Sequence, residues 1–134
     1  DQVIFEKDEV MKDDGKPYTV FTPYSKKWKA KLNEFYLKSY PTEKQFNHFY
    51  KQSAQSIPSL ERMGFESTGL SFPSSEVKDE IITKYKEQRD IPSVEGTSRL
   101  SVHLRFGTIS IRELAGHVKD LNETFLNELI MRQI

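Results

Sequence analysis

The spacing of apolar residues along the chain predicts a mainly helical protein. In residues 23–38 the apolar side chains recur every three to four positions, which places them on one face of an amphipathic helix. Thr22 and Pro23 suit the start of that helix, because a hydroxyl can cap it and a proline fits its first position. The predicted apolar face consists of Trp28, Leu32, Phe35 and Tyr36.

Besides a short helix over 100–106, three further helices are predicted in the second half of the chain. Residues 75–88 carry an apolar side chain every four positions, and Ser110 with Glu113 forms the capping-box pattern that opens a second helix. Asn122 is a suitable cap for the last helix. The expected buried residues are Val77, Ile81 and Tyr85, then Ile111, Leu114, Val118 and Leu121, then Leu126, Leu129 and Ile130.

The two ends and the middle of the chain follow other patterns. Val3-Ile4-Phe5 predicts a buried β-strand, and residues 18–21 are short and β-prone. Residues 39–75 combine prolines, glycines and serines with scattered aromatics, so we predict an interdomain connector with short helical turns near 43–50 and 58–63. The chain begins on a strand without a partner and stops inside a helical pattern, which predicts a piece of a longer protein.

Composition restricts the class of protein. The 134 residues include 20 basic and 20 acidic ones, so attraction of the whole surface to nucleic acid is not expected. The four lysines of residues 26–31 could form a local basic patch, although a solvated helix face is the simpler explanation. No apolar run approaches the roughly 20 residues of a membrane span. No signal peptide is recognisable, and cysteine is absent, so we expect a cytoplasmic protein.

The familiar catalytic motifs are missing, but one stretch has the residue types of a phosphate site. No nucleotide-binding glycine motif, P-loop, zinc-protease motif or carboxylate cluster is present, and the three histidines are far apart, so no metal is expected. GTSRLS at residues 96–101 precedes a predicted helix over 100–106 and joins free backbone N–H groups to hydroxyl donors. The residues alone leave two interpretations open, phosphate binding or a simple helix cap by Ser98 or Ser101.

The last helix also carries three side chains that share a face. Phe125, Glu128 and Arg132 are separated by three and four positions. Glu128 and Arg132 by themselves indicate a modest surface salt bridge of about 0.3–0.5 kcal/mol.

Several strings together resemble the DNA photolyase and cryptochrome flavoprotein family. YKEQRDIPSVEGTSRLSVHLRFGTISIRE is similar to the start of that family's flavin-binding domain, and FLNELIMR is similar to the helix that faces the DNA lesion. Upstream, DQVIFEKDEV and GKPYTVFTPYSKKW resemble the last strand of the family's α/β antenna domain and the segment that leaves it. The resemblance covers nearly the whole chain and is weakest across residues 39–75.

The resemblance implies a division of the chain. Residues 1–22 would be the end of the antenna α/β domain, with a residual β-strand, and residues 23–74 a helix and interdomain connector. Residues 75–134 would be the N-terminal part of the all-helical FAD-binding domain. Only one wall of the flavin site would then lie here, so this chain alone is expected to hold little FAD and to be inactive. The antenna chromophore would belong to the parent protein.

The resemblance also implies roles for individual residues. The FAD-binding residues would be Tyr85, Thr97, Ser98, Leu100, Ser101 and Phe125, with the two serines and Thr97 on the phosphates. Glu128 would be catalytic, because it matches the glutamate that hydrogen-bonds the damaged pyrimidine pair. The residues on the DNA side would be Arg89, Glu128, Met131 and Arg132. Met131 departs from the family pattern, which usually has a tryptophan that stacks on the lesion.

The activity implied is light-driven repair of UV-damaged DNA. In this family an electron from reduced FAD splits a cyclobutane pyrimidine dimer that has been flipped out of the duplex, and the cofactor supplies the chemistry. Two alternatives remain, a cryptochrome-type blue-light photoreceptor and a non-enzymatic helical interaction module. Glu128 and Arg132 favour repair, whereas Met131 favours the photoreceptor.

Overall fold

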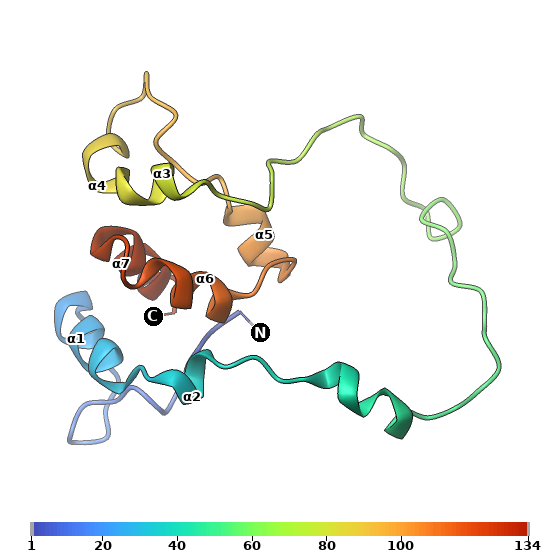
Figure 1. The fold of residues 1–134 in the computed structure, drawn as a ribbon, viewed down its shortest axis with the longest axis horizontal. Helices are drawn as coiled ribbons and strands as arrows, with labels where there is room; N and C mark the ends of the chain where they lie inside the picture. The colour runs from blue at the N-terminus through green and yellow to red at the C-terminus, as the bar shows by residue number, and fades with distance from the viewer. Residues whose placement is uncertain (1, 134) are drawn as a thin grey trace. The chain divides into compact units, whose positions relative to one another are not determined.

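The computed structural model describes residues 2–133, and within them the regular elements are all helical (Figure 1). The chain divides into two units, residues 1–39 with 74–134 and residues 40–73. The predicted mainly α fold is confirmed. None of the helices in the described part is long and apolar enough to cross a membrane. The elements are α1 (Phe21–Lys31), α2 (Glu34–Leu37), the 3₁₀ helix η1 (Thr42–His48), α3 (Asp79–Thr83), α4 (Tyr85–Gln88), α5 (Ser101–Phe106), α6 (Ile111–Val118) and α7 (Glu123–Met131).

The predicted strand at residues 3–5 is wrong, although its apolar side chains are buried. Ile4 and Phe5 are 3% and 5% exposed, but the backbone bends there and pairs with no strand among the described residues. The N–H of Ile4 donates instead to the side chain of Gln133, at 2.9 Å. The backbone groups of a strand need hydrogen-bonding partners on a neighbouring strand. Here the Gln133 side chain accepts the hydrogen bond of the Ile4 N–H instead. The assignment of residues 1–22 to the end of an antenna domain remains a prediction.

The single helix predicted for residues 23–38 is broken into two. Leu32 has extended backbone (ψ 129°), and Asn33 then accepts a hydrogen bond from the Phe35 N–H, which opens α2. The predicted cap is also wrong, because α1 begins at Phe21 after Val20, so Pro23 is its third residue. At the break, the Asn33 side chain competes with the helix for backbone hydrogen bonds. This local preference outweighs the continuous helical spacing of the apolar residues.

Helix α7 is the centre of the larger unit and packs against α1, α4 and α6 (Figure 1). Its predicted core residues Leu126, Leu129 and Ile130 are at most 5% exposed, and Asn122 caps it as predicted. Helix α6 begins with Ser110 accepting from the Glu113 N–H, as the capping box predicts. Leu121 was expected in the core but is 38% exposed, because it follows the end of α6.

Three of the lysines in residues 26–31 are paired with carboxylates. Lys27 contacts Asp13 at 2.9 Å, Lys29 contacts Glu123 at 2.6 Å, and Lys31 contacts Glu9 at 3.6 Å. Neutralised lysines attract phosphate less than free ones do. The pairing favours the solvated helix face over a basic patch.

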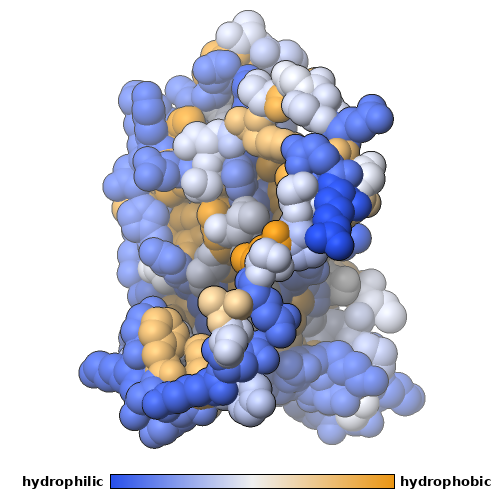
Figure 2. All heavy atoms as spheres, turned by 90° about the vertical axis from the view of Figure 1, so that its right-hand side faces the viewer, coloured by the Kyte–Doolittle hydropathy of each residue, from blue (hydrophilic) through white to orange (hydrophobic). Residues whose placement is uncertain are grey.

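The smaller unit, residues 40–73, contains η1 and a turn at residues 60–64. The two predicted helical turns are therefore present. Many large apolar side chains of this unit are exposed, including Tyr50 at 87% and Ile57 at 90%. Hydrophobic side chains are visible at the surface of the chain among hydrophilic ones (Figure 2).

Gln133 satisfies polar groups from three segments of the larger unit. Its side-chain oxygen accepts from the Ile4 N–H and, at 3.4 Å, from the indole N–H of Trp28, which is 0% exposed. Its amide donates to the Leu129 carbonyl, and its own carbonyl accepts from the Tyr24 hydroxyl. Buried indole and phenol groups need such partners, so Gln133 ties the N-terminal segment and α1 to the end of α7.

We expect Gln133→Ala to lower the free energy of unfolding by about 1–3 kcal/mol, because it leaves the N–H groups of Ile4 and of the Trp28 indole without an acceptor. Gln133→Glu keeps an acceptor oxygen and should cost less. Chemical denaturation of the three proteins measures both differences. Equal stability of the alanine variant and the wild type would contradict this role.

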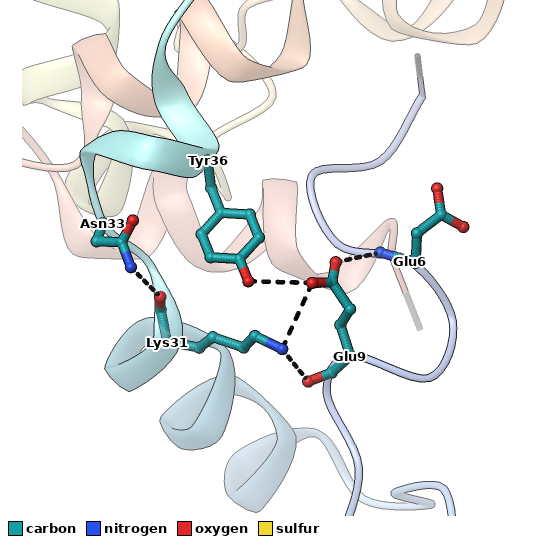
Figure 3. Close-up of polar contacts among 5 residues, drawn as sticks. All are labelled: Glu6, Glu9, Lys31, Asn33 and Tyr36. Atoms are coloured by element: carbon teal, nitrogen blue, oxygen red, sulfur yellow. Dashed lines mark hydrogen bonds and ion pairs between the residues drawn. The ribbon is translucent and has the colours of Figure 1, made fainter.

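A second polar cluster joins the N-terminal segment to α1 and α2 (Figure 3). The Glu9 carboxylate accepts from the Glu6 N–H at 2.9 Å and from the Tyr36 hydroxyl at 3.0 Å, and Lys31 donates to the Glu9 carbonyl at 2.7 Å. The Glu6 N–H, and then Tyr36 and Lys31, hold the pKa of Glu9 below its ordinary value, although partial burial acts in the opposite direction. Phe5 packs against Tyr36 and Trp28 beside this cluster, with ring centroids 4.5 and 5.3 Å away.

The depressed pKa of Glu9 predicts how stability changes with acidity. A carboxyl whose folded pKa is lowered stabilises the fold above its unfolded pKa, and this contribution is lost as the pH falls through the folded pKa. Glu9→Gln should therefore be less stable than wild type near neutral pH and equally stable in strong acid. Denaturation curves between about pH 7 and about pH 3 test this. A constant difference across that range would show that the charge of Glu9 contributes nothing.

Candidate functional site

Helices α4 and α7 meet at a contact between two aromatic rings. Tyr85 opens α4, and Phe125 lies in the first half of α7, where it is 4% exposed. The ring centroids are 4.9 Å apart with an interplanar angle of 68°, an edge-to-face arrangement. The Asn122 side chain, which caps α7, also donates to the Thr83 carbonyl at 3.0 Å. The start of α7 is thereby fixed against α3 and α4.

A charged pair lies beside these rings. The Arg89 guanidinium, at the end of α4, donates to the Glu128 carboxylate of α7 and forms an ion pair with it. The guanidinium carbon is also 5.6 Å from the centroid of the Tyr85 ring, within cation–π range. The Arg89 side chain is 32% exposed and that of Glu128 is 47% exposed, so solvent and solutes reach both.

The surroundings shift the pKa of two of these groups. Partial burial raises the pKa of the Tyr85 hydroxyl, and the negative charge of Glu128 raises it further. The hydrogen bond and charge of Glu128 raise the pKa of Arg89. Tyr85 is therefore a neutral hydrogen-bonding group and Arg89 a permanent cation at physiological pH.

The predicted phosphate-binding run starts where a loop returns to α4. A Cβ built at Gly96 would lie 2.6 Å from the Gln88 Cβ and 2.9 Å from the Gln88 carbonyl oxygen, so the two backbones touch. Arg99 has a positive φ of 54°, and Leu100 is buried at 2% exposure just before α5 begins at Ser101. Thr97 and Ser101 are exposed, whereas Ser98 is half-buried.

The interpretation that Ser98 or Ser101 is a simple helix cap is only partly confirmed. Leu100, not a serine, occupies the cap position of α5, and no side chain caps that helix. The Ser98 hydroxyl accepts from the Leu100 N–H at a long 3.4 Å. The hydroxyls of Thr97 and Ser101 thus remain accessible at the start of α5.

The structure brings four of the predicted site residues into one cluster: Tyr85, Arg89, Phe125 and Glu128. Met131 (50% exposed) and Arg132 follow at the end of the same helix, and both are exposed. The expected surface pair of Glu128 with Arg132 is replaced, because Glu128 pairs with Arg89. Sequence reasoning missed this pairing, since two partners that are 39 positions apart in the sequence give no local signal.

Three curated proteins named deoxyribodipyrimidine photo-lyase are similar over most of the chain. That of Alkalihalophilus pseudofirmus is 30% identical over 98% of this chain and 31% of its own length. That of Escherichia coli K12 is 32% identical over 99% of this chain and 32% of its own length. That of a Synechococcus strain is 31% identical over 84% of this chain and 26% of its own length.

No family model matches the chain, and no solved structure matches it. The similarity to the curated proteins nevertheless covers nearly all of its residues. The chain belongs to the deoxyribodipyrimidine photolyase family. It spans no more than 32% of the length of these three photo-lyases.

The contact between Gly96 and Gln88 predicts a strong effect of a small substitution. Gly96→Ala should destabilise the protein by about 1–3 kcal/mol, because the new methyl group overlaps backbone atoms that cannot rotate away. Gly116→Ala is the matched control, since the nearest atom to its added Cβ is the Leu37 Cδ1 at 3.9 Å. In the middle of α6 that change should be neutral or stabilise by about 0.5–1 kcal/mol. Thermal unfolding compares the two, and equal effects would contradict the close approach.

Proposed function

We propose that the complete product of the gene encoding this chain repairs cyclobutane pyrimidine dimers in DNA, using light and a reduced flavin. The observation that supports this most is the cluster on α4 and α7, in which Tyr85, Arg89, Phe125 and Glu128 lie together. In this cluster, residues that match the flavin-binding positions of the family lie next to residues that match its DNA-binding positions. The curated relatives named as photo-lyases support the same reaction class.

The residues near the start of α5 fit the phosphates of FAD. Thr97 and Ser101 offer exposed hydroxyl donors, and the first backbone N–H groups of a helix are free to donate to an anion. Gly96, in contact with α4, brings this run close to the helix that carries Tyr85. We propose that Thr97, Ser98, Ser101 and the backbone at Leu100 hold the phosphates. Tyr85 would contribute its neutral hydroxyl, and Phe125 an apolar wall.

FAD, when bound and reduced, supplies the electron that splits the dimer under light. The residues of this chain would orient the damaged bases and balance the charge of the DNA phosphates. The Glu128 side chain is exposed at the surface of α7, where it would contact a flipped base, and Met131 lies one turn further along α7. Arg89 and Arg132 supply positive charge for the DNA phosphates. Met131 offers an adaptable apolar surface to the lesion but no aromatic face.

The decisive experiment uses the complete gene product, loaded with reduced FAD and mixed with an oligonucleotide that contains one thymine dimer. We expect intact thymines to be restored under blue light and not in darkness. Glu128→Ala should lower the repair yield at least a few fold at unchanged flavin content, because the proposed hydrogen bond that orients the damaged bases is lost. Thr97→Ala with Ser101→Ala should instead lower the flavin content.

The matched control is Glu123→Ala, an exposed acid in the first turn of the same helix that pairs with Lys29. It should repair like the wild type. Flavin binding without light-dependent repair would contradict the proposed activity and favour a blue-light photoreceptor. Absence of flavin binding would mean that residues 96–101 only shape the start of α5.

A further inference from the structure

The ion pair between Arg89 and Glu128 joins two side chains for which the proposed function requires different partners. Arg89 is proposed to contact a DNA phosphate, and Glu128 the damaged bases. In the structure they are bonded to each other across α4 and α7. Full use of either group by DNA would compete with this bond.

The charges around Arg89 oppose contact with undamaged DNA. The Arg89 Nε lies 3.6 Å from the Asp90 carboxylate, so two acidic side chains flank one cation. The three groups together carry one net negative charge. A phosphate that takes the Nη1 donor of Arg89 displaces Glu128, and this leaves an unpartnered carboxylate beside the DNA backbone.

We propose that the Arg89–Glu128 pair is a specificity device: it makes phosphate binding by Arg89 favourable only when a damaged base pair takes over Glu128. This inference rests on the proposed function. Undamaged DNA offers Arg89 a phosphate but offers Glu128 no hydrogen-bonding partner, and a polar group left unpaired weakens binding. Damaged DNA satisfies both members of the pair at once.

The pair has features that suit such an exchange. The side chains are 32% and 47% exposed, so a phosphate reaches Arg89 without opening the core. An exposed ion pair contributes little stability, and so it is readily broken. Tyr85 lies under the guanidinium, and Phe125 packs against Tyr85, so the arginine keeps its position when its carboxylate leaves.

The test is a double-mutant cycle of DNA binding in darkness, with the complete gene product and duplexes with and without one thymine dimer. Glu128→Gln should tighten binding of the undamaged duplex about two- to fivefold, which corresponds to the interaction free energy of an exposed ion pair. It should weaken binding of the damaged duplex, so the ratio of the two affinities falls. In an Arg89→Gln background the same substitution should give a clearly smaller gain on undamaged DNA.

Two further measurements separate this device from a general effect of charge. Glu123→Gln removes a negative charge from the same helix, but its partner is Lys29. Its effect should therefore be the same with Arg89 present or replaced. Arg89→Gln should reduce the slope of log affinity against log salt by about 0.9, as expected for one lost phosphate contact. Circular dichroism verifies that each variant is folded.

Equal gains from Glu128→Gln in both backgrounds would overturn the proposed exchange, as would an unchanged ratio of affinities. Light-dependent repair by the wild type would then still support the photolyase function. Absence of repair in the light, with the predicted coupling in darkness, would contradict the repair activity but support the exchange.

Discussion

The burial of one face of α7 is the constraint on which the rest of the larger unit depends. Phe125, Leu126, Leu129 and Ile130 are all at most 5% exposed, and they pack where α1, α4 and α6 converge. Because a helix turns once every 3.6 residues, burying this face fixes the opposite one. Glu128 and Met131 consequently stand on the exposed side, next to the end of α4. The packing of the core thus positions the candidate site.

Electrostatic pairing shapes this surface more than net charge does. The chain has equal numbers of acidic and basic residues, and the lysines of α1 largely face carboxylates. The arginine beside Glu128 is bonded to that acid. A surface arranged in this way attracts a polyanion weakly as a whole. Recognition of a particular DNA structure would then depend on the replacement of individual ion pairs.

The C-terminal part of the described chain serves the fold as well as the site. Gln133, which follows α7, has a structural use. It accepts from the Ile4 backbone and the Trp28 indole, which lie more than 100 residues earlier. The buried but irregular segment at residues 3–5 is held by this contact and by the aromatic packing of Phe5. Residues 40–73 have no comparable core, and many of their large apolar side chains are exposed.

The sequence by itself determined the helical class, the caps of α6 and α7 and the core of α7, because these depend on residues three or four positions apart. It also indicated the family, and with it the types of residue at the candidate site. The tertiary structure decided what depends on distant segments. It bent residues 3–5, since their backbone partner is the side chain of Gln133. It paired Glu128 with Arg89 and not with Arg132. Contacts between segments far apart in the chain leave no periodic signal, and only the folded packing reveals them.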